Sequence, residues 1–135
     1  QGLGVSKNHR KANVWHKLAA EQGNAAAQFN LGLNYQYALG VRQNYENAFV
    51  WYELAAEQGH SEAQLNLGLM YDEGIGVEEE NVLAHMWYNI SAENGNAQDA
   101  ISRDLVGREM TPEDVLAALD LAHKCIKSNY RHCEY

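Results

Sequence analysis

The run Ala55-Ala56-Glu57-Gln58-Gly59 repeats the run Ala19-Ala20-Glu21-Gln22-Gly23 at a distance of 36 residues. A looser copy, Ser91-Ala92-Glu93-Asn94-Gly95, follows at the same distance. Tryptophan recurs in one register, at Trp15, Trp51 and Trp87. A fixed period of this length is the signature of a solenoid, in which each unit buries its apolar face against its neighbours. The period therefore predicts a repeat protein that works by presenting a surface.

Each period is predicted to contain two helices separated by glycine turns. Asn44 can cap a helix start with its side-chain oxygen, and Gly59 supplies the left-handed residue that ends that helix. Gly68 lies inside the next helix, where a glycine costs about 1 kcal/mol unless a neighbouring helix approaches closely there. We expect antiparallel helix pairs, with helices at about 8–22, 25–38, 44–58, 61–73 and 80–94.

The third unit departs from the pattern and predicts a closing cap. Asp99 stands where the earlier units have alanine, Arg103 where they have leucine, and Asp104 where they have glycine. Thr111 and Pro112 then form a strong helix start, with threonine as the cap and proline in the first turn. Terminal repeats of solenoids are atypical because one side faces water.

Composition excludes several classes of function. The 135 residues carry a net charge of −8, with 18 acidic and 10 basic side chains, which argues against a nucleic-acid partner. No run reaches the roughly 18 apolar residues of a membrane span. The chain starts at Gln1 part-way through a repeat, so we expect that a signal peptide, earlier repeats or both precede it in the gene product.

The repeated motif resembles the Sel-one-like repeat (SLR), a relative of the tetratricopeptide repeat. It is carried by the following residues: Ala63, Leu67, Gly68, Tyr71, Gly74, Gly76, Val77, Ala84, Trp87, Tyr88, Ala92, Glu93 and Gly95. The resemblance implies an all-α, right-handed α-solenoid of antiparallel helix pairs that acts as an adaptor or scaffold. It brings no catalytic residues. We expect one domain over residues 1–135, with a partial repeat at about 1–23, repeats at 24–59 and 60–95, and a C-terminal cap at 96–135.

In tetratricopeptide relatives the first helix of each pair lines a concave groove. On this basis seven residues off the main core face are predicted to form a peptide-binding groove: Phe29, Asn30, Leu33, Tyr37, Leu65, Asn66 and Leu69. Asparagines one unit apart, beside an apolar stripe, could hold an extended peptide by its backbone. The alternative is that these leucines pack against the adjacent helix pair.

The two cysteines, Cys125 and Cys133, leave three readings open. Secreted bacterial members of the resembled family carry similar C-terminal pairs, which implies a local disulfide and a periplasmic or secreted protein. Such a bond requires the last helix to stop near Lys127, with Tyr130 folded back on it. The other readings are two free thiols, or a metal set completed by His123 and His132 in an enzyme-like or metal-binding module.

The sequence contains no nucleophile motif and no phosphate-binding glycine loop. The recurring tryptophans are predicted to fill equivalent interior sites. We therefore predict a non-enzymatic scaffold that binds a protein or peptide ligand, without a cofactor.

Overall fold

The computed structural model describes residues 7–131 and 133, and within them the chain forms seven helices and no strand. The predicted all-α fold is confirmed. The helices are α1 (Lys7–Glu21), α2 (Ala25–Tyr37), α3 (Tyr45–Ala56), α4 (Ser61–Glu73), α5 (Asn81–Glu93), α6 (Asp99–Gly107) and α7 (Pro112–Lys127).

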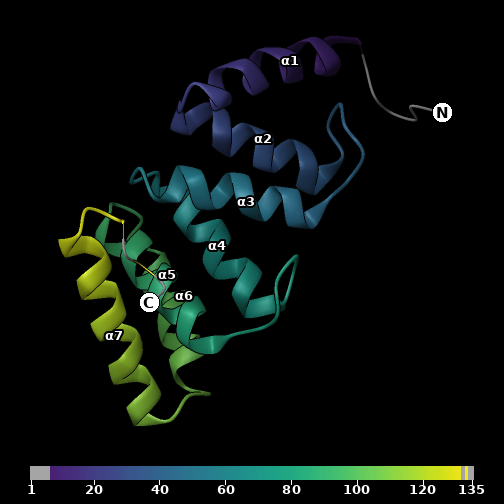
Figure 1. Cartoon of the computed structure of the whole chain (residues 1–135). Coiled ribbons are helices and arrows are strands. Elements are labelled where there is room, and N and C mark those ends of the chain that lie inside the picture. The colour runs from purple at the N-terminus through teal and green to yellow at the C-terminus, as the bar shows by residue number, and fades with distance from the viewer. Residues whose placement is uncertain (1–6, 132, 134–135) are drawn as a thin grey trace.

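From α1 to α6, consecutive helices pack against one another as antiparallel pairs that stack into a solenoid (Figure 1). Helix α7 closes the array by packing against α5. The main core runs from α3 to the tail and is centred on buried α5 side chains such as Trp87 and Tyr88. A smaller core, formed by Ala20, Ala27 and Leu31, joins α1 to α2.

In the α2–α3 and α4–α5 pairs, a glycine on the first helix faces a tyrosine ring on the second. A Cβ atom placed on Gly32 would overlap the ring of Tyr52, and one placed on Gly68 would overlap the ring of Tyr88. Both tyrosines are fully buried. The close approach predicted at Gly68 is confirmed, and it recurs one repeat earlier.

The hydroxyls of these tyrosines tie each pair together in the same way. Tyr52 donates a hydrogen bond of 2.6 Å to Oε1 of Gln36, and Tyr88 donates one of 2.9 Å to Oδ2 of Asp72. Burial raises the pKa of both tyrosines, so their hydroxyls remain protonated donors at physiological pH.

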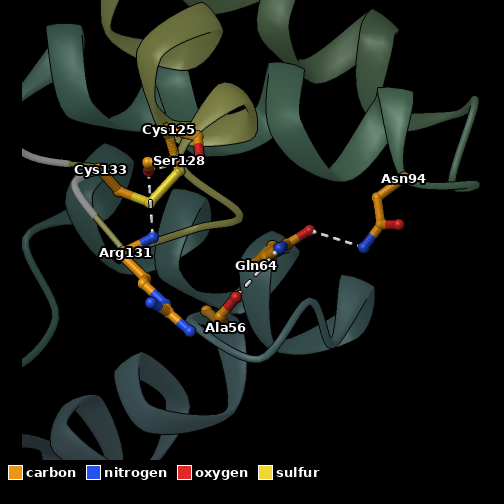
Figure 2. Close-up of a disulfide and its surroundings, with 7 residues drawn as sticks. All are labelled: Ala56, Gln64, Asn94, Cys125, Ser128, Arg131 and Cys133. Carbon is orange, nitrogen blue, oxygen red and sulfur yellow. Dashed lines mark hydrogen bonds between the residues drawn. A yellow bond between two sulfur atoms is a disulfide. The ribbon is translucent and has the colours of Figure 1, made fainter.

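Buried amide side chains connect successive pairs, a feature that the sequence reasoning missed. Gln64 is fully buried, and its Nε2 donates to the carbonyl oxygen of Ala56 at 3.1 Å, while Asn94 donates to Oε1 of Gln64 at 3.2 Å (Figure 2). Gln28 makes the equivalent bond to the carbonyl of Ala20. The 36-residue spacing of Gln28 and Gln64 in the sequence could have indicated that both have the same structural role.

The prediction that all three tryptophans fill interior sites is wrong for one of them. Trp87 is 1% exposed, but Trp15 on α1 is 73% exposed. Trp51 is partly exposed and packs against the small core between α1 and α2. Within the described residues no helix pair precedes α1 to cover Trp15 as α1 and α2 cover Trp51.

We predict that Gly68→Ala lowers the free energy of unfolding by about 1–3 kcal/mol, because the added methyl group must displace the buried ring of Tyr88. Gly107→Ala is the matched control. It also lies in a helix, but its Cβ would meet only ordinary contacts with His85 and Val115, so it should be neutral or slightly stabilising. Urea denaturation of both variants measures the difference, and equal stabilities would contradict close packing at Gly68.

Candidate interaction surface

The seven predicted groove residues lie on α2 and α4, the first helices of two successive pairs. Tyr37 is 59% exposed and Leu69 is 37% exposed, while the other five are partly buried. Phe29, Leu33 and Leu65 also pack against the main core, so the alternative reading of core packing holds in part. None of the seven is fully covered. We call this set, Phe29, Asn30, Leu33, Tyr37, Leu65, Asn66 and Leu69, the groove face.

Aromatic contacts hold Phe29 in place between two neighbouring elements. Its ring stacks on His60 at a centroid distance of 4.7 Å and lies 5.7 Å from the ring of Tyr52. His60 caps the start of α4, with Nδ1 accepting the backbone N–H of Ala63 at 3.2 Å. The apolar end of the groove face is therefore fixed by the turn between α3 and α4.

Asn66 is partly buried and lies near the hydroxyl of Tyr52. Burial raises the pKa of Tyr52, and hydrogen bonding with Asn66 offsets only part of the rise. Its repeat partner Asn30 is partly buried. The two asparagines thus remain accessible in part, but the Asn66 amide already has an interaction with Tyr52.

Two clefts lie near the two ends of α4. One, of about 450 Å³, lies where the start of α4 meets the α5–α6 turn and is lined by Glu62, Leu65 and residues 95–99. The other, of about 650 Å³, lies between two interhelical loops and is lined by residues 43–46 and 76–78. Only the first cleft includes a residue of the groove face, Leu65.

Cys125 and Cys133 form a disulfide, as predicted (Figure 2). Helix α7 ends at Lys127, between the two cysteines. Asn129 and Tyr130 have φ angles of 60° and 68°, and this left-handed pair turns the chain back toward the helix. The backbone N–H of Tyr130 donates to the carbonyl of Cys125 at 2.7 Å.

The tail reaches beyond α7. A Cβ atom placed on Gly59, in the α3–α4 turn, would lie 3.1 Å from Cε2 of Tyr130. The expectation that Tyr130 folds back on the last helix is therefore incomplete, because its ring also contacts the second repeat. Ser128 secures the turn, accepting the backbone N–H of Arg131 and donating to the carbonyl of Cys125 (Figure 2).

The disulfide uses both sulfur atoms, so the Cys and His metal set has no thiolate available. His123 is exposed, and His132 lies outside the described residues. Within residues 7–131 and 133, no three His, Cys, Asp or Glu side chains gather in a way that could hold a metal ion. His85 is buried with an unpartnered Nδ1, and burial, followed by the charge of Arg103, lowers its pKa.

Comparison with known sequences identifies the repeat. The sequence profile described as the Sel1 repeat matches the chain three times, at residues 1–24, 25–60 and 61–96. No curated protein sequence matches the chain.

The solved structures that are similar to this chain include two repeat proteins from bacteria. A protective antigen of uropathogenic Escherichia coli strains, which displays an SLR fold, is 34% identical over 95% of this chain with a TM-score of 0.88. A Sel1 repeat protein from Oxalobacter formigenes is 44% identical over 77% of this chain with a TM-score of 0.71. The matched regions span 28% and 43% of those two chains, respectively.

We predict that replacing both cysteines, as Cys125→Ser with Cys133→Ser, lowers the free energy of unfolding by about 2–3 kcal/mol, the loss expected for so short a closed loop. Urea denaturation of the oxidised wild type and the variant measures the loss. Reduced wild-type protein is the matched control and should unfold like the variant. A variant as stable as the oxidised protein would show that the bond does not secure the tail.

A second prediction concerns pH. Burial lowers the pKa of His60, against an opposing effect of Glu62, and only the neutral ring can accept the N–H of Ala63. The stability that His60 contributes is thus present above its ordinary pKa of about 6.5 and is lost as pH falls below that value. His60→Asn, which installs the capping residue found at Asn24, should reduce the fall in unfolding free energy from about pH 7.5 to 5. His85 still contributes to the pH dependence of stability in this variant. An unchanged pH profile would exclude His60 as a source of the fall in unfolding free energy.

Proposed function

The chain belongs to the Sel1 repeat family, and from this premise we propose that it is a non-enzymatic scaffold that binds a protein or peptide ligand along the groove face. Sel1 repeat proteins generally act as protein-interaction scaffolds. Membership of the family supports the general role. The surface, the ligand and the absence of enzymatic activity in this protein are our proposal.

The observation that carries the proposal is the partial exposure of large side chains at repeat-equivalent positions. Leu33 and Leu69 occupy one register on α2 and α4, and neither is fully covered. A side chain needed only for packing between helix pairs would be buried, as Leu67 is. Apolar side chains at a constant spacing suit a ligand that spans two repeats.

The chemistry of the groove face favours an extended segment of protein. Phe29 and Leu65 offer apolar contacts, while the amides of Asn30 and Asn66 can pair with a peptide backbone. The face carries no charged residue. A nucleic acid, which needs a basic surface, is a poor fit to a chain with 18 acidic and 10 basic residues.

We propose a periplasmic or secreted location. The disulfide between Cys125 and Cys133 supports it, because such bonds persist in oxidising compartments. No helix among the described residues has the length and hydropathy needed to cross a membrane.

Selection of ligands from a random peptide library, followed by affinity measurement, tests the groove face. Tyr37→Ser combined with Leu69→Ser should weaken the affinity for the selected peptides by about tenfold or more, because the variant lacks two apolar side chains that would contact the bound peptide. Both side chains are partly exposed, so the change in stability should stay within about 0.5 kcal/mol.

Leu54→Ser is the matched control, because Leu54 is 40% exposed but lies on α3, the second helix of its pair. It should leave the affinity of the selected peptides unchanged. Equal losses in both variants, or no loss in the groove variant, would contradict the proposed surface.

A further inference from the structure

Two buried positions of the repeat change together where the second helix pair meets the third, one on α5 and one on α6. Ala27 and Ala63 share one register and are buried, and the same position on α6 is Asp99, which is only 5% exposed. Ser91 likewise replaces the buried Ala55 of the preceding repeat. A pair of methyl groups has thus become a hydroxyl and a carboxylate.

Ser91, near the end of α5, and Asp99, at the start of α6, are hydrogen-bonded to each other. The Oγ atom of Ser91 lies 2.6 Å from Oδ2 of Asp99 and 2.9 Å from the carbonyl oxygen of Ser61. A hydroxyl carries one hydrogen and can donate to only one of these acceptors. The carbonyl of Ser61 lies in the first turn of α4, where a backbone N–H of the helix serves as its donor, so the Ser91 hydroxyl can donate to Asp99. The side chain that Asp99 contacts is thus a neutral hydroxyl.

No cation within the described residues compensates Asp99. The two ion pairs there join Arg103 to Asp104 and Lys124 to Asp120. Asp99 begins α6, and a helix N-terminus stabilises a carboxylate only modestly. Burial of an unpaired charge costs more free energy than this effect returns.

The cleft beside Asp99 corresponds to a space that is filled one repeat earlier. At the first junction the rings of Phe29 and His60 stack at 4.7 Å. The equivalent residues at the second junction are Leu65 and Asn96, whose smaller side chains line the cleft of about 450 Å³. Glu62, at a position that is alanine in the earlier repeat, lines the same cleft.

We propose that this cleft binds an arginine side chain of the ligand, with the guanidinium group between Glu62 and Asp99 and its plane over Leu65. The inference rests on the proposed function, because Leu65 belongs to the groove face. A guanidinium group is planar, like the His60 ring that fills the first junction, and it offers hydrogen-bond donors and a positive charge to the two carboxylates. Residues 41–95 hold ten acidic residues and one basic residue, Arg42, so their field also favours a basic ligand.

The probe for this site is the tripeptide acetyl-Ala-Arg-Ala-amide, titrated into the whole chain while amide NMR resonances are recorded. Saturable shifts are expected at Gly95 and at residues 96–99. The same peptide with citrulline in place of arginine keeps the shape of the side chain without its charge. Its affinity should be lower by about tenfold or more. Equal binding of the two peptides, or no shifts at these residues, would overturn the proposal.

Two variants localise the binding. Ser91→Ala with Asp99→Ala restores the alanines that the other repeats bury at these positions. Leu65→Phe with Asn96→His instead fills the cleft with the pair found at the first junction. Each variant that folds should bind the arginine peptide at least about tenfold more weakly. Glu79→Ala, which removes one exposed acid outside the cleft, is the control and should leave the affinity for the arginine peptide unchanged. Wild-type affinity in a folded cleft variant would exclude the site.

The two proposals can fail independently. The tripeptide is short enough to occupy the cleft alone, so Tyr37→Ser with Leu69→Ser should not affect its binding. If library peptides depend on Tyr37 and Leu69 while the arginine and citrulline peptides bind alike, the groove face stands and the arginine site falls. If the arginine peptide binds as expected but library peptides bind the groove variant as tightly as the wild type, the arginine site stands and the groove face falls.

Discussion

The contact between a helix glycine and a buried tyrosine ring sets the spacing on which the solenoid depends. Gly32 against Tyr52 and Gly68 against Tyr88 bring the two helices of each pair closer than any side chain larger than hydrogen would allow. The tyrosine hydroxyls then bond back to the first helix. The 36-residue period therefore carries both halves of the contact, and the α2–α3 and α4–α5 pairs share the same geometry.

Constant geometry is what makes the local differences informative. Where α2 meets the α3–α4 turn, Phe29 and His60 fill the junction. Where α4 meets the α5–α6 turn, a cleft lies at the equivalent place, next to the buried carboxylate of Asp99. A charge in a position that otherwise holds a methyl group is costly to the fold. This cost supports the arginine site that we propose beside Leu65 of the groove face.

The two ends of the array differ in how well their apolar side chains are covered. At the C-terminal end, α7 covers α5, and the disulfide holds the tail so that Tyr130 reaches Gly59 in the second repeat. At the N-terminal end of the described residues, Trp15 is largely exposed. A solenoid unit buries its apolar face only against a neighbour, so the same residue type is buried at Trp87 and exposed at Trp15.

The sequence by itself determined the helices, their register, the close approach at Gly68 and the family to which the chain belongs. These features follow from local spacing, caps and glycine turns, which neighbouring repeats do not alter. The resemblance also supplied the disulfide and the residues of the groove face, and the structure leaves those residues partly exposed. Only the tertiary structure decided that Trp15 is exposed, that Gln64 bridges two helix pairs, and that Asp99 is buried beside a cleft. Burial and hydrogen bonding at these positions depend on which element covers the residue, and that is a property of the stacked pairs.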